Sequence, residues 1–315
     1  MVAVGVDSIR FHKAFHPEIV KEKILPKMGR DKNGMHWFHG ILTFTNQHDP
    51  YRFSFQLSPG KIVNGNNYIP ATPEIIEKGI KQFEDMTGLD VQDAQISRLD
   101  VAMNIQMERR VNDYFDVMDM KRGYDKLDYD HSRYLNNRCG KKSMVMYDKQ
   151  AEMKEKNEWD YNNKIENLMR IEYRMKRNVE RCLGIDKDMP ILKLAHLTEA
   201  YGFIGAIMAF EKETTRLLGL KSCMENKKGK MIDAAMDMLS MKHLDEMEVM
   251  LMEMMDGKKD DGSMDILKKR KLGYMRKEIY DKMRAGCDGM YGKYKLMMEP
   301  TMKKEEMMRK RGKRK

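Results

Sequence analysis

The chain has 315 residues, of which 41% are hydrophobic and 34% charged, and its formal net charge is +10 with a pI near 9.2. This length is enough to bury a core in one large or two ordinary domains. The basic excess favours a polyanionic partner, nucleic acid before an anionic membrane. The longest apolar stretch, residues 203–210, is too short to span a bilayer, so we expect no membrane partner.

The four cysteines include no Cys-x-x-Cys pair, which disfavours a zinc knuckle. The first ten residues lack a basic start followed by a long apolar run, the pattern of a secretory signal. Reduced thiols in a cytoplasm are the simplest interpretation.

The first part of the chain mixes strands and helices. Segments 2–11, 37–44 and 52–57 are rich in aromatic and β-branched residues, which predicts strands, and the Ser58-Pro59-Gly60 run predicts a turn. A helix is expected to begin with Thr72 as N-cap and to end at Gly88.

Further strands are expected over 96–105, 143–147 and 168–176, with a short helix over 111–120 and a polar loop over 125–133. Helical periodicity dominates residues 191–255 and 266–298, and methionine recurs at helical spacing over 231–255. The sequence thus predicts an α+β fold, a mostly antiparallel sheet with flanking helices followed by a helical C-terminal region. The predicted divisions are a domain over 1–180, a helical region over 181–302 and a basic tail over 303–315.

Two of these strands each place one carboxylate beside arginine. Side chains alternate faces along a strand, so Asp100 shares its face with Arg98, and Glu172 shares its face with Arg170 and Arg174. If the strands are neighbours, the carboxylates can share a metal and the arginines can hold phosphates. The plainer interpretation is a pair of half-buried amphipathic strands with solvated salt bridges.

A third acidic position follows the 143–147 strand. Glu152 falls at a strand end or on the first turn of a helix, and Asp148 is the other acid there. Either one could complete a set of three oxygen ligands. Oxygen ligands with water suit Mg²⁺ or Mn²⁺ and not a metal that prefers thiolates.

Tyr134 is a candidate nucleophile because of its neighbours. Arg133, Arg138 and two following lysines supply positive charge for an incoming phosphate. A tyrosine hydroxyl has a pKa near 10, so attack needs a base, a nearby cation or a metal-polarised phosphate. Tyr147 is the second candidate.

Several segments together resemble the motifs of one known family. They are Ser97–Ala102, Tyr134-Leu-Asn-Asn-Arg138, Tyr147-Asp-Lys-Gln-Ala-Glu152 and Arg170-Ile-Glu-Tyr-Arg174, preceded by Gly5–Ile9 and by the run from Ser58 to Asn67. In their order and spacing they are similar to the rolling-circle replication initiators of filamentous phages and related plasmids. The resemblance covers about residues 1–177. Asn136 stands where the family often has Gly, and Asn104 stands where a second Asp is frequent.

The resemblance implies a DNA strand-transferase acting in a bacterial host cytoplasm. Tyr134 would attack one strand at the origin, leaving a 5′-phosphotyrosyl link and a free 3′-hydroxyl. Asp100, Glu152 and Glu172 would hold Mg²⁺ or Mn²⁺, and Lys149 would neutralise charge near the phosphate. Arg98, Arg138, Arg170 and Arg174 would contact DNA.

The expected partner is single-stranded or supercoiled origin DNA. The helical region is the candidate site for origin DNA, a host helicase or another copy of the chain, and a host polymerase is a further candidate partner of the protein. Two alternatives stay open: a metal-dependent nuclease that uses water, with Tyr134 structural, and a DNA-binding protein without catalytic activity.

Overall fold

The structure, a computed structural model, describes residues 2–118, 121–159, 165–184, 191–220, 241–254 and 263–312. Ten strands form one antiparallel sheet in the order β2-β3-β4-β5-β1-β6-β10-β9-β8-β7. The strands are β1 (Val2–Ala14), β2 (Met28–Arg30), β3 (His36–Phe38), β4 (Ile41–Asn46), β5 (Asp49–Leu57), β6 (Gln95–Gln106), β7 (Tyr124–Tyr129), β8 (Ser132–Asn137), β9 (Lys142–Asp148) and β10 (Leu168–Met175). The fold class is α+β, as the sequence predicts.

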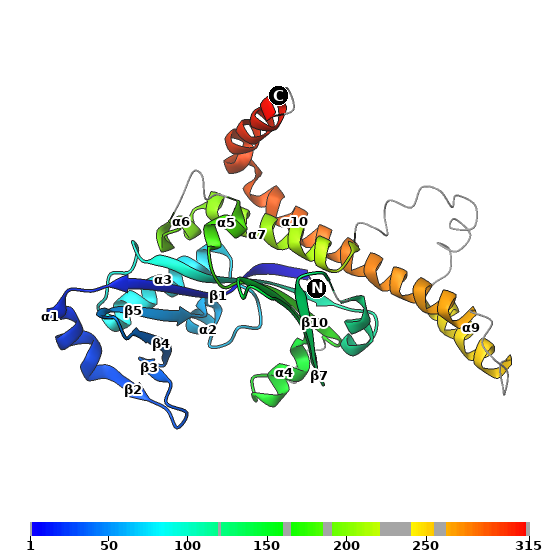
Figure 1. Cartoon of the computed structure of the whole chain (residues 1–315), viewed down its shortest axis with the longest axis horizontal. Helices are drawn as coiled ribbons and strands as arrows, with labels where there is room; N and C mark the ends of the chain where they lie inside the picture. Colours follow the sequence, from blue (N-terminus) through cyan, green and yellow to red (C-terminus); the bar gives the residue numbers. More distant parts are fainter. Residues whose placement is uncertain are drawn as a thin grey trace.

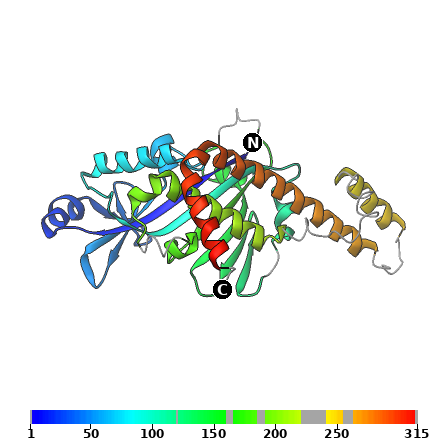
Figure 2. The same cartoon turned by 90° about the horizontal axis from the view of Figure 1, so that it is seen from above.

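The helices are distributed unevenly over the two faces of this sheet. Figure 1 shows α7 and α10 above the sheet and α4 below it, and Figure 2 shows α10 crossing over the strands. The helical elements are α1 (Pro17–Ile19), η1 (Val20–Ile24), η2 (Leu25–Lys27), α2 (Pro59–Asn64), α3 (Pro73–Thr87), η3 (Val111–Val117), α4 (Lys149–Glu155), α5 (Val179–Leu183), α6 (Leu194–Thr198), α7 (Ala200–Leu217), α9 (Met241–Met254) and α10 (Ser263–Gly312).

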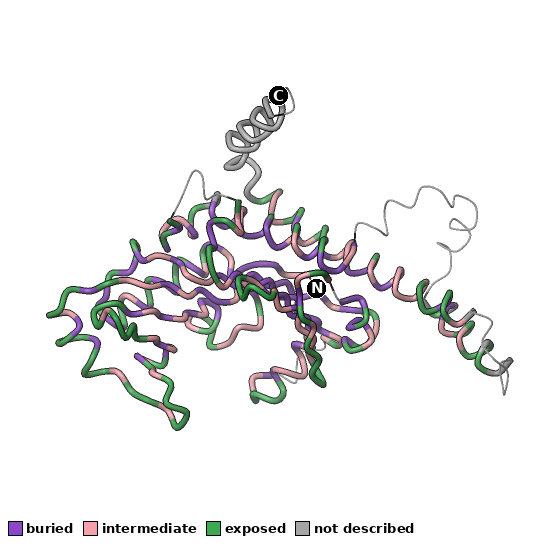
Figure 3. Tube along the Cα trace, viewed as in Figure 1, coloured by how far each residue is buried: buried purple, intermediate pink, exposed green. Residues whose placement is uncertain are grey.

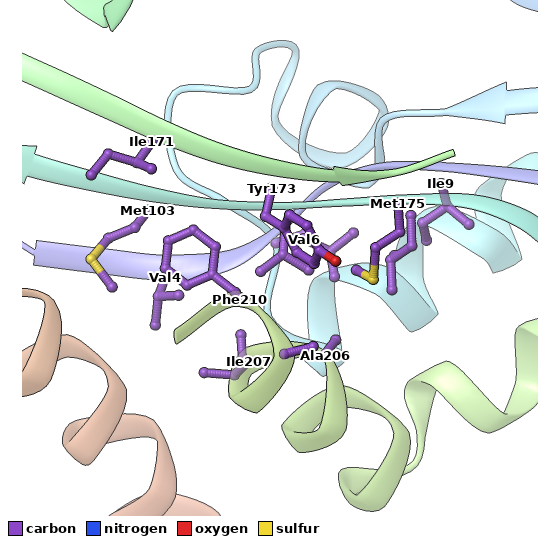
Figure 4. Packing of buried hydrophobic residues seen from close by; sticks show 14 of the residues in the cluster. Val4, Val6, Ile9, Met103, Ile171, Tyr173, Met175, Ala206, Ile207 and Phe210 are labelled. Carbon is purple, nitrogen blue, oxygen red and sulfur yellow. The ribbon is translucent and has the colours of Figure 1, made fainter. Parts of the chain in front are cut away.

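The main apolar core lies between the sheet and the helices above it. Met103 on β6 and Ile171 and Met175 on β10 are fully buried, as are Ile207 and Phe210 on α7. Figure 4 shows these side chains facing one another across the sheet–helix boundary, and Figure 3 shows buried chain concentrated in the same layer. Alternate residues of each strand therefore fill this core, which leaves the other face of β6 and β10 to polar side chains.

The helix expected after Thr72 is confirmed as α3. Thr72 is extended, Pro73 is the first helical residue, and Gly88 ends the helix in the left-handed conformation with φ +68°. Glycine adopts that conformation without a Cβ clash, which is why it stops helices so often. Phe83 of α3 packs edge-on against Phe11 of β1, with ring centroids 5.7 Å apart.

Three local predictions were wrong. The polar segment expected as a loop over 125–133 is a hairpin, in which β7 pairs with β8 from Tyr124↔Asn137 to Tyr129↔Ser132. An edge strand such as β7 pairs on one side only and carries few apolar residues, so it lacks the pattern of a buried strand. The single strand expected over 37–44 is broken at His39 and Gly40, which both have positive φ, into β3 and β4. The Ser58-Pro59-Gly60 run, expected as a turn, instead begins the helix α2, with Ser58 as its N-cap.

The C-terminal part is helical where it is described. The α10 helix packs along α7 and against β1, and α9 lies against the first part of α10 (Figure 1). The methionine-rich stretch over 231–255 lies outside the described residues except for 241–254, and residues 313–315 of the basic tail lie outside them as well. In the described part of the chain, no helix has the length and apolar character needed to cross a membrane.

Candidate active site

The polar face of the sheet lines up residues from distant parts of the chain. Antiparallel pairing places Glu172 on β10 opposite Ala102 on β6 and opposite Val145 on β9, and it places Val145 opposite Tyr134 on β8. Directly paired residues project from the same face. The sheet therefore brings Glu172 and Tyr134 to one face with only Val145 between them.

Glu172 is almost fully buried and is held by two neighbours. Tyr147 Oη donates a hydrogen bond to Glu172 Oε1 at 2.6 Å, and Arg174 Nε donates to Oε2 at 2.8 Å. Burial alone would raise the pKa of Glu172, but the positive charges of Arg174 and Arg170 outweigh burial and lower it. Glu172 is therefore ionised at neutral pH.

Arg170, expected to contact DNA, has a side chain with no exposed surface. Its Nε donates to Asn104 Oδ1 at 2.6 Å, and its Nη1 donates to Asp7 Oδ1 at 2.7 Å. Its Nη2 donates to the main-chain oxygens of Asn67 and Tyr68, both at 2.7 Å. All three nitrogens are engaged, so Arg170 fastens the segment around Asn67 onto the sheet and is closed to phosphate in this conformation.

Asp7 is an acidic residue of the cavity that the sequence did not single out as a site residue. It lies at a bulge in β1, between the pairs Val6↔Val101 and Ser8↔Asp100. Burial, followed by the nearby charge of Glu172, raises the pKa of Asp7 to about 6, although Arg170 partly opposes this. The one available signal was its place inside the Gly5–Ile9 motif, because a strand bulge cannot be read from alternation.

Helix α4 supplies the next carboxylate. Asp148, the N-cap, accepts a hydrogen bond from the Ala151 backbone at 2.9 Å, which starts the helix and places Glu152 on its first turn. Lys149 and Lys156 both donate to Glu152. Burial alone would raise the pKa of Glu152, but these two lysines lower it. Lys149 itself is fully buried and also donates to Asn67 Oδ1 at 2.9 Å, so it sits behind Glu152.

These groups meet in one polar cavity of about 400 Å³. The cavity wall is made by Asp7, Asn67, His131, Ser132, Tyr134, Tyr147, Asp148, Glu152, Glu155, Lys156, Glu172 and Arg174. Of the expected site residues, the structure thus brings Tyr134, Glu152, Glu172 and Arg174 together. The cavity lies where β8, β9 and β10 meet α4, on the face away from α7 and α10.

Tyr134 lines this cavity and is half-buried. The Arg174 guanidinium lies 5.7 Å from the centre of its ring, and Tyr129 packs edge-on against it with centroids 5.4 Å apart. Within the described ranges, no residue forms a hydrogen bond with the Tyr134 hydroxyl. Its phenol is therefore open to a ligand that enters the cavity.

Tyr147 has a different environment. Its hydroxyl is committed to Glu172, and burial together with the charge of Glu172 raises its pKa well above the usual value. A buried phenol beside a carboxylate ionises with difficulty. It does, however, have a hydrogen-bonded proton acceptor already in place.

Asp100 lies on the polar face but does not line the cavity. It accepts hydrogen bonds from Ser8 Oγ at 2.9 Å and from Arg98 Nη2 at 2.7 Å, and it is 2% exposed. The interpretation that the salt bridges of this strand are solvated is therefore wrong at Asp100. Here the polar face is buried and its charges are paired internally. Arg138, also expected at the site, is exposed in the turn after β8 and pairs with Asp125 at 2.9 Å.

The oxygen donors of the cavity suit a hard divalent cation in their chemistry. Asp7, Glu152 and Glu172 are all carboxylates on one wall, and the raised pKa of Asp7 marks a negative charge that a cation would stabilise. In the described part of the chain, however, no three His, Cys, Asp or Glu side chains are already gathered as a metal site. Arginines and lysines hold these carboxylates instead, so a metal would have to displace some of those contacts.

Comparison with known proteins gives a sequence-family match and similarity to solved structures. Residues 47–195 match the N-terminal part of a sequence family described as replication-associated protein. A solved structure described as the rolling circle replication initiator protein from Geobacillus stearothermophilus is similar over 60% of this chain and 80% of that chain, with 12% sequence identity and a TM-score of 0.34. That TM-score is too low to inform the site. No curated protein sequence matches this chain.

Proposed function

We propose that the chain nicks and rejoins DNA at a replication origin through a tyrosine. The match of residues 47–195 to the replication-associated protein family and the motifs similar to those of rolling-circle initiators support this proposal. The observation that carries the proposal is the shared cavity. Its wall holds Glu152, Glu172 and the Tyr134 hydroxyl, which has no hydrogen-bond partner among the described residues. A nucleophile beside carboxylates and an arginine is the set that phosphoryl transfer through a covalent intermediate requires.

In the first step, Tyr134 Oη forms a bond to a phosphorus of the DNA backbone, and the bond from phosphorus to the 3′-oxygen breaks. The phenol proton passes to a carboxylate of the cavity, and the leaving 3′-oxygen takes up a proton to become a free 3′-hydroxyl. Arg174, beside the Tyr134 ring, can stabilise the negative charge on the phosphate oxygens. Rejoining is the reverse attack by a 3′-hydroxyl on the phosphotyrosine.

We further propose that Mg²⁺ or Mn²⁺ binds here, with Glu152 and Glu172 as ligands. Asp7 is better placed than Asp100 to be the third ligand, because Asp7 lines the cavity and Asp100 does not. Such a cation would polarise the phosphate when bound. Lys149 would then hold Glu152 and Asn67 in position from behind.

A second candidate nucleophile is Tyr147. The contact in its favour is the 2.6 Å hydrogen bond to Glu172, which could accept the phenol proton directly. Its pKa, raised well above the usual value, counts against it. The nuclease alternative, in which water attacks, would leave no covalent link to either tyrosine.

Covalent trapping separates these candidates. The full chain is incubated with labelled single-stranded origin DNA and Mn²⁺ or Mg²⁺, and the adduct is resolved on a denaturing gel. We expect an adduct that Tyr134→Phe abolishes and that Tyr147→Phe reduces only in part. Tyr51→Phe, a change at an exposed tyrosine of β5, is the matched control and should leave the adduct unchanged.

Each contrary result has a distinct meaning. An adduct that persists in Tyr134→Phe and disappears in Tyr147→Phe would move the nucleophile to Tyr147. Cleavage without any adduct would favour the water-using nuclease. Binding without cleavage in either metal would favour a DNA-binding protein without catalytic activity. Equal activity in EDTA would remove the metal from the proposal.

A further inference from the structure

A row of positive side chains crosses the polar face next to the cavity. Arg10 on β1 is paired directly opposite Arg98 on β6. Lys176 follows β10 on the same side as Arg174, which is paired opposite Asp100. Like charges directly opposite one another on neighbouring strands destabilise a sheet. The facing arginines Arg10 and Arg98 therefore favour a negative partner at this place.

The charges of this row are only partly balanced within the protein. Arg98 is paired with Asp100. Arg10 contacts the neutral Gln56 through Nη2, and its guanidinium lies 3.9 Å from the centre of the Phe44 ring. Its buried Nε has no hydrogen-bond partner among the described residues. Lys176 has no ion pair with any residue in the described ranges. Burial and then the nearby positive charges of Arg98 and Arg174 lower the pKa of Lys176, and burial and then Arg98 lower the pKa of Arg10. An anion bound along this row would stabilise the charged forms of both Lys176 and Arg10.

An aromatic surface adjoins the same row. A second cavity, of about 470 Å³, has Leu127, Tyr129, Tyr134 and Lys176 in its wall. Pairing places Leu127 opposite Tyr134, and Tyr129 opposite Ser132, on the polar face of the sheet. Tyr129 is 61% exposed and Leu127 is 47% exposed, which is unusual for neighbouring large apolar side chains. Tyr134 and Arg174 line both cavities, so the two spaces meet at the proposed nucleophile.

We propose that this face holds the single-stranded DNA next to the cleaved phosphate. Its bases stack on Tyr129 and Leu127, and its phosphates lie along Lys176, Arg98 and Arg10. The partner is single-stranded because stacking on an aromatic side chain requires unpaired bases, whereas duplex DNA hides the faces of its bases. The direction of the path rests on the proposed function, which fixes the reacting phosphate at Tyr134.

Both the charge and the shape of this face fit single-stranded DNA. Unbalanced cations alone would suit any polyanion, and an exposed apolar edge alone could pair with another strand. Their combination on one face, converging on one tyrosine, fits a chain with an anionic backbone and planar bases. Arg10 and Lys176 are therefore assigned as DNA contacts in addition to Arg98 and Arg174.

The test measures binding separately from cleavage. Fluorescence anisotropy with a labelled single-stranded oligonucleotide is recorded in EDTA, with the full chain carrying Tyr134→Phe so that no adduct forms. Tyr129→Ala should weaken binding by about 5- to 100-fold through lost stacking. Lys176→Gln and Arg10→Gln should each lower the slope of log affinity against log salt by about 0.7.

Matched controls lie on the opposite face of the same sheet. Lys126 is paired with the buried Leu135, so Lys126→Gln changes a lysine of the same hairpin on the helix-covered side. Tyr51→Ala removes an exposed tyrosine that shares its side of β5 with Phe53 and Phe55. Both controls should bind like the parent chain, and urea midpoints of all variants should agree.

Three results would overturn the inference. In the first, Tyr129→Ala and Lys176→Gln bind single-stranded DNA as tightly as the parent chain. In the second, their loss of affinity is no larger than that of the control variants. In the third, they lose as much affinity for duplex DNA as for single-stranded DNA. Adduct formation by the chain with Tyr134 intact, assayed in parallel, keeps the two proposals apart. If an adduct forms and these variants bind normally, the strand path is wrong and the nicking function stands. If the variants lose binding and no adduct ever forms, the strand path stands and the nicking function fails.

Discussion

The two faces of β6 and β10 are both buried, but by different means. On one face, Met103, Ile171 and Met175 pack against α7, so their burial comes from apolar contact (Figure 4). On the other, Arg170 and Glu172 are buried by their own ion pairs and by the segment around Asn67. Apolar burial stabilises without regard to exact partners, whereas each charge on the polar face depends on a particular neighbour. We therefore expect the stabilisation to be spread over many contacts on the apolar face and to depend on a few individual contacts on the polar face.

The largest expected effect is at Arg170. Arg170→Met keeps much of the side-chain volume but leaves Asp7 and two main-chain oxygens without their donor. Removing one partner of a buried pair costs about 3–5 kcal/mol, so we expect a loss of that size in the free energy of unfolding in urea. Arg138→Met, the same change at an exposed ion pair, should cost at most about 1 kcal/mol. Equal losses for the two variants would end the distinction.

On the apolar face, the matched change is Ile171→Ala. Truncating this fully buried side chain should lower the free energy of unfolding by about 2–4 kcal/mol, through lost apolar contact and the cavity left behind. Nicking per folded molecule, measured well below the unfolding transition, should stay within about twofold. A large loss of nicking in the fully folded variant would mean that the two faces are not separable.

We expect the contribution of Asp7 to the free energy of unfolding to depend on pH. Its pKa is raised in the folded protein to about 6 from 3.8, so its contribution to stability is full below the lower value and declines as pH rises through the higher one. Without metal, the decline between about pH 5 and about pH 8 should be on the order of 1–2 kcal/mol.

Asp7→Asn removes this decline. Urea unfolding in EDTA should show the variant gaining about 1–2 kcal/mol on the parent as the pH is raised over that range. Asp125→Asn, which removes an exposed carboxylate paired with Arg138, is measured in parallel as the control. A parallel pH dependence of Asp7→Asn and the parent would contradict the prediction.

The smallest change in stability is expected at a buried hydroxyl of the helical layer, that of Thr214. Thr214 on α7 is fully buried, and its Oγ1 has no hydrogen-bond partner within the described residues. Thr214→Val removes that unsatisfied hydroxyl at nearly constant shape, so the free energy of unfolding should rise by about 0.5–1 kcal/mol. Ser8→Ala is the contrast, because Ser8 Oγ donates to Asp100, and its removal should destabilise by about 1–2 kcal/mol. A destabilised Thr214→Val would indicate a partner for the hydroxyl, such as water.

Local patterns predicted the elements whose signals are complete within a few residues. The alternation along β6 and β10 gave the correct face for Asp100 and Glu172, and the Thr72-Pro73 start and Gly88 end gave α3. The β7–β8 hairpin was missed because its polar edge strand β7 lacks the alternation of a half-buried strand. As a result, Tyr134 was expected just after a loop, whereas it lies within the strand β8. Asp7 was missed because its approach to Glu172 arises from a bulge.

The fold class, the polar face and the motifs that resemble rolling-circle initiators can be inferred from the amino-acid sequence, because alternation, caps and short motifs are local. Which acids share the cavity follows from the folded arrangement, in which Asp7 and not Asp100 lines the wall. The folded arrangement also decides which arginines are free to meet a ligand, since it buries Arg170 among four acceptors. Strand order and register bring residues together across long separations in the chain, and neither can be read from any one segment.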